Sequence, residues 1–197
     1  MKQEKVSSIL ETSKKMFARY GPRKTSIDEM ARLARVAKAT IYNYFGSKEG
    51  VYLEVLRREK DGLLKKLSDS VDEESLPSDK LIVFVKKKFR YMREAINILN
   101  LDREGIVSLI PDTESIRNEL FEREVGIIHS ILKDGVENGI FYLKYPLVTA
   151  KAIAHALRGF ELHWLIQESE ENIDYYLDEF MNILSYGIVS PKKGAAV

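Results

Sequence analysis

Hydrogen-bonding and aromatic side chains alternate in the segment KATIYNYF, which spans residues 38–45. At 100° per residue, a helix over this segment points Ile41 in one direction and Asn43 in the opposite direction, with Tyr42 beside Asn43. The same angle places Ala37 and Phe45 near Ile41, so these three residues are expected to form the seam that packs against the preceding helices. An asparagine can pair with both N6 and N7 of adenine, and a tyrosine hydroxyl can donate to a phosphate oxygen. A helix with this outward face has the chemistry needed to read the major groove of DNA.

An ordinary solvent-exposed helix can carry the same residue types, so the neighbouring elements decide between the two interpretations. Ser26 and Glu29 form a capping box, S-x-x-E, at the start of a preceding short helix. A tight turn at residues 35–37 joins this helix to the segment above, which Gly46 ends, and Ser47 caps the helix that follows. Two short helices joined by a tight turn are typical of a helix-turn-helix unit.

Three positions flanking this unit are suited to contacting phosphates. Lys48 is the first residue of the next helix, where a cation is mildly unfavourable unless a phosphate approaches the same helix start. Glu49 offsets part of that cost, so a solvated surface lysine is the alternative. Thr25 and Ser26 offer hydroxyls and free N–H groups to a second phosphate.

Charge and composition point to the same end of the chain. Residues 1–48 hold eleven Lys or Arg and four Asp or Glu, although the net charge of all 197 residues is only +1. A basic head on an acidic body is expected when one end meets a polyanion, with chance segregation as the alternative. The absence of cysteine excludes disulfides and thiol chemistry, and no apolar run reaches the length of a membrane span. We expect a cytoplasmic protein without a signal peptide.

The whole chain reads as helix, because long alternating β-branched runs are missing. The spacing predicts a helix at residues 5–20 that Gly21 ends, and a buried stripe in each of the first two helices. Beyond the helix-turn-helix unit, helices are expected at residues 47–69, 78–100, 102–110, 112–138, 146–168 and 172–190. The expected fold is all-α with about nine helices, divided into an N-terminal three-helix domain at residues 1–47 and a helical domain at residues 48–197.

The segment TSIDEMARLARVAKATIYNYFGSKEGVYLEVL resembles the N-terminal signature of the TetR family of bacterial transcriptional regulators, over roughly residues 9–56. The resemblance implies a homodimer that binds palindromic operators and releases them when a small molecule enters the C-terminal domain. It makes Thr40, Tyr42, Asn43 and Tyr44 recognition-helix contacts. Together with the residue-level arguments, the predicted DNA contacts are Thr25, Ser26, Arg35, Lys38, Ala39, Thr40, Tyr42, Asn43, Tyr44 and Lys48.

Two residues depart from the family pattern in the turn. Arg35 stands where the family often has glycine, and a left-handed non-glycine residue costs about 1 kcal/mol. Ala37 stands where the family often has serine, so the second short helix lacks a side-chain cap. Arg35 is therefore predicted as a phosphate contact that could recover the cost.

The C-terminal body is rich in large apolar residues, most of which we expect in the core, and some of which could line an effector cavity. The predicted pocket residues are Phe89, Met92, Arg103, Phe121, His129, Phe160, His163 and Trp164. A stripe of small residues in the helix at 146–168 predicts close packing, either across a two-fold axis or within the monomer. The predicted dimer residues are Ala152, Ala156, Gly159, Phe180 and Leu184.

Other classes of protein fit the sequence less well. An enzyme using His129 and His163 would lack any catalytic motif, and the three histidines do not have the spacing of a metal site. We expect no metal and no cofactor, and an unknown small-molecule effector. A DNA-binding protein without an effector is the remaining alternative to a ligand-released repressor.

Overall fold

The computed structural model describes residues 2–98, 114–166 and 173–187, and their side chains except at residues 2, 95–98 and 162–166. These residues form helices and no strand, which confirms the all-α fold. The predicted helix at residues 102–110 lies outside the described residues, as do Asp112 and Asn172, with which two later helices were predicted to begin. The described helices are α1 (Lys2–Lys24), α2 (Ile27–Ala34), α3 (Lys38–Phe45), α4 (Lys48–Asp72), α5 (Pro77–Ile98), α7 (Glu114–Glu137), α8 (Pro146–Ile166) and α9 (Ile173–Tyr186).

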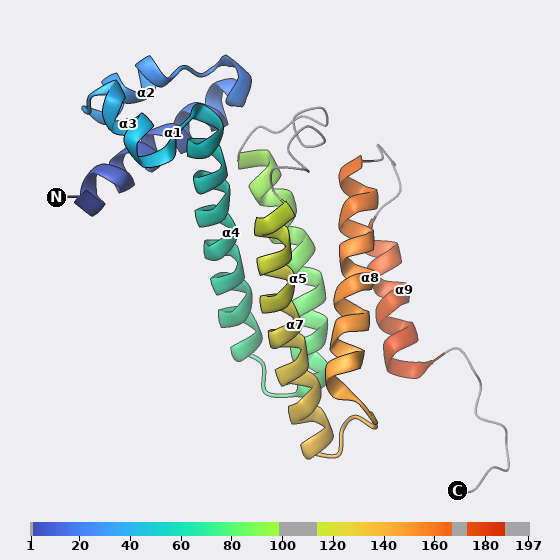
Figure 1. Ribbon diagram of the computed structural model, residues 1–197. Helices are drawn as coiled ribbons and strands as arrows, with labels where there is room; N and C mark the ends of the chain where they lie inside the picture. Colours follow the sequence, from blue (N-terminus) through green and yellow to red (C-terminus); the bar gives the residue numbers. More distant parts are fainter. Residues whose placement is uncertain (1, 99–113, 167–172, 188–197) are drawn as a thin grey trace, which may run out of the picture.

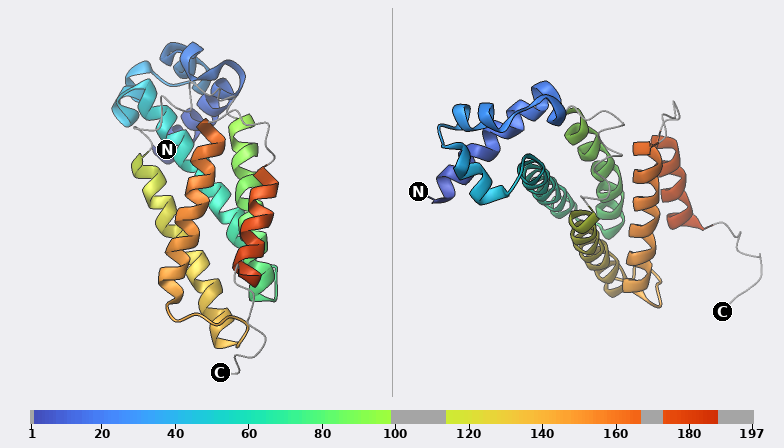
Figure 2. Two further views of the ribbon diagram at one scale, coloured as in Figure 1. Left: turned by 90° about the vertical axis from the view of Figure 1, so that its right-hand side faces the viewer. Right: turned by 45° about the horizontal axis from the view of Figure 1, so that its top comes forward.

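Helices α1, α2 and α3 form a small head at one end of α4, and the remaining helices run lengthwise beside each other (Figure 1). Helix α4 packs against α5, α5 against α7, and α7 against α8. Figure 2 shows that α8 and α9 form the edge of the body that lies farthest from α2 and α3. None of the described helices is long and apolar enough to cross a membrane.

Two separate hydrophobic cores hold this arrangement together, and α4 contributes to both. The first core joins α1, α2 and α3 to the start of α4, up to Leu56. The second begins on α4 at Leu64 and continues through α5, α7, α8 and α9. The cores therefore divide within α4, beyond the predicted domain boundary at residue 47. The stripes predicted for the first two helices are buried, namely Ile9, Leu10, Ser13, Met16, Phe17, Ile27, Met30, Ala31 and Ala34.

Several helix ends differ from those predicted. Helix α1 begins at Lys2, earlier than the predicted residue 5, but its regular part ends at Gly21 as predicted, because the φ of 75° and ψ of 159° of Gly21 are not helical and separate it from a short turn that reaches Lys24. Helix α5 begins at Pro77 rather than after Ser78, because proline is favoured at a first helical position, where its missing N–H has no intrahelical partner to lose. Helix α9 ends at Tyr186, where the left-handed Gly187 donates to the carbonyl of Ile183, earlier than the predicted residue 190.

Candidate DNA-binding site

Helix α3 has one buried face and one exposed face, as its sequence predicts. Ile41 is fully buried in the first core, and Tyr44 and Phe45 are half-buried against it. Tyr42 is 45% exposed, Thr40 is half-buried, and Ala39 and Asn43 are exposed. The side chains suited to base edges therefore face outward, and the aromatic residues divide between the exposed face and the seam.

Ala37 corrects one detail of that prediction. It was expected to lie in the seam with Ile41 and Phe45, but it is exposed. Ala37 is the N-cap of α3, with an extended backbone (φ −70°, ψ 144°), so the helical 100° step does not apply to it. It makes no side-chain capping hydrogen bond, as predicted.

The turn between α2 and α3 is a Schellman motif built around Arg35. Arg35 has φ 55° and ψ 45°, and its N–H donates to the carbonyl of Arg32 at 3.3 Å. The N–H of Val36 donates to the carbonyl of Ala31 at 3.0 Å, which completes the motif. The sequence left open whether the turn differs from the family's or keeps a left-handed residue, and the structure shows a left-handed Arg35. Its side chain is exposed, and its phosphate contact stays a prediction.

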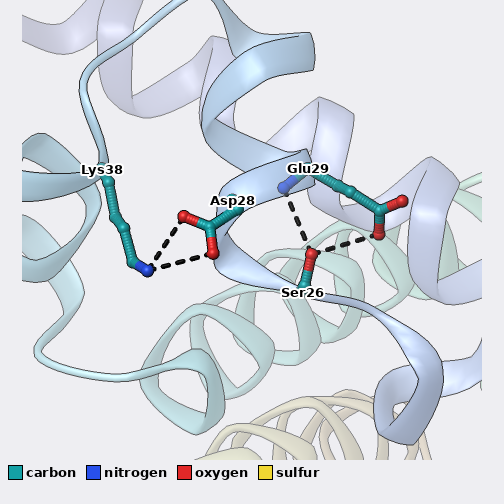
Figure 3. A network of polar contacts seen from close by, with 4 residues as sticks. All are labelled: Ser26, Asp28, Glu29 and Lys38. Atoms are coloured by element: carbon teal, nitrogen blue, oxygen red, sulfur yellow. Dashed lines mark hydrogen bonds and ion pairs between the residues drawn. The ribbon is translucent and has the colours of Figure 1, made fainter.

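Polar contacts at the start of α2 hold the two short helices in position (Figure 3). The Ser26 hydroxyl accepts from the backbone N–H of Glu29 at 3.3 Å and lies 3.2 Å from the Glu29 carboxylate. Lys38 Nζ lies 2.9 and 3.0 Å from the two carboxylate oxygens of Asp28. The hydrogen bond and charge of Asp28 raise the pKa of Lys38 above its ordinary value. Lys38 therefore ties α3 to α2 at the edge of the exposed face.

The start of α4 is tied to the loop that precedes α2. The Ser47 hydroxyl accepts from the N–H of Gly50 at 3.0 Å, and Lys48 Nζ donates to the carbonyl of Thr25 at 3.4 Å. Thr25 is only 4% exposed, and its hydroxyl donates to the carbonyl of Pro22 at 2.9 Å. The Thr25 hydroxyl thus supports the loop in this conformation, and phosphate contacts from Thr25, Ser26 and Lys48 stay predictions.

Gly50 is a positioning residue that the sequence analysis missed. A Cβ at this position would lie 2.0 Å from the carbonyl oxygen of Phe45, so only glycine lets the end of α3 approach α4 this closely. The available signal was an isolated glycine near the start of a long helix, which usually has a packing reason.

The predicted pocket residues do not gather around a described cavity. Phe89 and Phe121 belong to the second core, with 2% and 8% exposure, and Met92 and Phe160 pack against that core. His129 is half-buried on α7. Arg103 and the side chains of His163 and Trp164 lie outside the described residues.

A groove of about 1120 Å³ lies elsewhere in the body, lined mainly by α4 and α7. None of the predicted pocket residues lines it, and charged side chains of both signs do, including Asp61 and Arg123, which form an ion pair with each other. No group of three or more His, Cys, Asp or Glu among the described residues could hold a metal ion.

The predicted dimer residues occupy the outer edge of the body. Ala152 and Gly159 are exposed on α8, and Ala156 is half-buried. Phe180 and Leu184 of α9 are half-buried against the second core, and the Phe180 ring packs edge-on to Phe160 at 5.6 Å between centroids. Ala152 and Gly159 are thus not covered by the described part of the chain, and the dimer interface stays a prediction.

A capped α2, a left-handed turn and an α3 with one buried and one outward polar face define a helix-turn-helix protein of the DNA-binding class. The family model for bacterial regulatory proteins of the tetR family matches residues 9–55. An HTH-type transcriptional regulator of Bacillus subtilis, YhgD, is 30% identical over 149 residues, which cover 72% of this chain and 74% of that protein. The chain belongs to the TetR family of transcriptional regulators.

Solved structures share the complete architecture. A transcriptional regulator from Cytophaga hutchinsonii superposes with a TM-score of 0.72 at 23% identity, covering 92% of this chain and 94% of that one. FadR from Bacillus subtilis, in complex with stearoyl-CoA, superposes with a TM-score of 0.65 at 16% identity, covering 93% and 99%. The fold of the head and the body is thus the fold of known regulators.

Proposed function

We propose that this protein is a ligand-responsive, homodimeric repressor that binds a palindromic operator and is released by a small apolar or amphipathic molecule. The observation that carries the proposal is the outward face of α3, where Tyr42 is 45% exposed one residue after the fully buried Ile41. A solvent-exposed tyrosine and asparagine, held on a short helix by a buried neighbour, are suited to entering a major groove.

In this proposal the roles on α3 follow from side-chain chemistry. Asn43 pairs with an adenine edge, and Ala39 and Thr40 contact thymine methyl groups. Tyr42 and Tyr44 donate to phosphate oxygens, and Arg35, Lys38 and Lys48 supply positive charge near the backbone. Lys38 has to exchange its Asp28 partner for a phosphate or keep both.

The proposed dimer forms through α8 and α9. Ala152 and Gly159 are exposed on α8, and the larger apolar residues Val148 of α8 and Ile183 of α9 are exposed as well. Apolar and small side chains on one edge of a helical body favour a self-complementary interface, as a two-fold axis requires. A two-fold dimer presents two α3 helices to successive major grooves, which explains why the operator is proposed to be palindromic.

The proposed effector is amphipathic or apolar. The second core lies between helices of the body, which is a common location for ligand sites in helical proteins. The stearoyl-CoA complex of FadR supports a ligand of this kind, because that protein shares the fold of this chain.

Selection of bound sequences from a random duplex pool tests the proposed function. We expect the full chain to enrich an inverted repeat, with two chains per duplex and an affinity that falls steeply with salt. Enrichment of no sequence would contradict the proposal and favour a DNA-binding protein without an operator. Release of the enriched duplex by an amphipathic molecule tests the effector part separately.

A further inference from the structure

A buried ion-pair network joins helices α5, α7 and α8, and further cations lie near one end of it. Lys88 of α5 is 6% exposed, and its Nζ donates to the carboxylates of Glu124 on α7 and Glu161 on α8, the latter at 2.8 Å. Burial lowers the pKa of Lys88, but the two carboxylates outweigh this effect and raise it above its ordinary value. The charges of Glu124 and Glu161 are thus committed to one buried ammonium.

Three further cations surround the Glu161 end of this network, and we call them the cationic cluster: Lys60 of α4, Arg117 of α7 and Arg158 of α8. None of the three makes a hydrogen bond or ion pair with another residue that the structure describes. Arg117 is close enough to Arg158 for repulsion, and its nearby carboxylates are Glu161 and the exposed Glu114. Positive charge is in excess at this point of the body.

The surroundings of the cluster are partly desolvated. Burial lowers the pKa of Lys60 below its ordinary value, the carboxylate of Glu161 opposes this, and Arg117 and Lys88 add to it. Burial also lowers the pKa of Arg117. Half-buried cations that have no hydrogen-bonding partner among the described residues are costly, so an anion at this place would be favoured.

A buried aromatic ring of the second core adjoins the cluster: Phe121 is 8% exposed and also packs against the ring of His155, at 4.6 Å between centroids. The guanidinium of Arg158 lies over the ring of Phe121, 5.6 Å from its centroid. Arg117, Phe121 and Glu124 recur at three-and-four spacing on α7, so the charged and aromatic groups share one face of that helix. A ligand with an anionic end and an apolar end would find both partners within two turns of α7.

We propose that Lys60, Arg117 and Arg158 bind the anionic head group of the effector, a carboxylate or a phosphate, and that Phe121 contacts the apolar part beside it. Guanidinium groups match both anions because they donate two parallel hydrogen bonds. This inference rests on the proposed function, since it names the chemistry of the effector.

The position of Lys60 also places the head group next to the contacts that hold the DNA-binding head. The neighbouring Glu59 pairs with Lys14 of α1 at 2.7 Å, and Arg58 donates to Ser7 of α1 at 3.5 Å. An anion bound by Lys60 would therefore act on the turn of α4 that anchors α1.

Binding of three matched probes to the full chain tests the site: dodecanoate and dodecyl phosphate, each below its micellar concentration, and dodecanol below its solubility limit, all measured by calorimetry. We expect at least one anionic probe to bind about tenfold or more tightly than dodecanol. The anionic probe that binds more tightly identifies carboxylate or phosphate as the preferred head group.

The variants Lys60→Met and Arg117→Gln should each lose about tenfold of the anion affinity and leave dodecanol binding unchanged. Lys66→Met, at an exposed position of the same helix, should change neither.

Dodecanol binding as tight as anion binding, no binding of any probe, or an anion preference that survives in folded Lys60→Met would each overturn the inference. Circular dichroism and thermal unfolding establish that each variant is folded. The operator assay separates this inference from the proposed function. If dodecanol releases the operator from wild type and Lys60→Met alike, the regulator is ligand-responsive but the anion site is wrong.

Discussion

The head and the body of the molecule position their polar side chains by different means. In the head, local backbone conformation and helix caps position them: the caps at Ser26 and Ser47, the left-handed Arg35 and the close approach of helices at Gly50. In the body, side chains from α5, α7 and α8 pair with each other across the interior, with Lys88 at the centre. Helix caps and turn conformations can be predicted from neighbouring residues in the sequence, whereas ion pairs between distant helices cannot.

The largest effect is expected from breaking the central pair of the body. Lys88→Met leaves two carboxylates buried without their partner, so we expect a loss of about 3–5 kcal/mol in the free energy of unfolding. Lys86→Met is the matched control on α5, because Lys86 forms an exposed ion pair with Asp178 and should contribute less than about 1 kcal/mol. Urea denaturation followed by circular dichroism measures both. Equal losses in the two variants would contradict the buried network.

The corresponding test of the head is Gly50→Ala. Its Cβ would meet the carbonyl oxygen of Phe45, so α3 has to shift, at a cost of about 3 kcal/mol and with loss of operator affinity. Gly62→Ala is the control in the same helix, where a Cβ meets nothing within 4 Å, and it should stabilise the protein by about 0.5–1 kcal/mol. A stable Gly50→Ala variant with full operator affinity would show that the close approach is not needed.

Arg35→Gly separates the backbone role of Arg35 from its charge. Glycine adopts the left-handed conformation without the cost borne by other residues, so we expect a gain of about 1 kcal/mol in the free energy of unfolding. If the side chain contacts a phosphate, operator affinity falls at the same time and the salt slope decreases by about one. A less stable variant would contradict the account of the turn.

The smallest effect is expected at Tyr52, a buried polar group without a described partner, in contrast to Lys88, which is buried with two partners. The Tyr52 hydroxyl is buried with no hydrogen-bond partner among the described residues, and its ring packs edge-on to Phe17 at 5.0 Å between centroids. Tyr52→Phe keeps the ring and removes the hydroxyl, so stability should stay equal or rise by up to about 1 kcal/mol. Thermal unfolding measures the change, and a marked loss would mean that the hydroxyl has a stabilising role.

The sequence predicted the head better than the body, because contacts in the head are between neighbouring residues whereas those in the body join distant helices. The outward face of α3 and the caps at Ser26 and Ser47 follow from helical periodicity and capping chemistry over a few residues, whereas the conformation of Arg35 was left open. Ala37 was misplaced because helical periodicity was extended one residue beyond the helix. Phe89 and Phe121 lie in the second core, and their part in an effector pocket stays a prediction, since periodicity identifies an inward face without saying what it meets. Lys88 was missed because its partners are on other helices.

The most direct test of the central claim is the operator affinity of the double variant Tyr42→Ala/Asn43→Ala, measured on the selected inverted repeat. Both side chains are exposed on α3, so the variant should fold normally and bind the operator about 100-fold more weakly. The loss on unrelated DNA should be smaller, because only the phosphate contact of Tyr42 is independent of sequence. Tyr142→Ala removes a fully exposed tyrosine of the body and should bind as wild type does. A folded double variant with wild-type operator affinity would contradict the assignment of α3 as the DNA-reading helix.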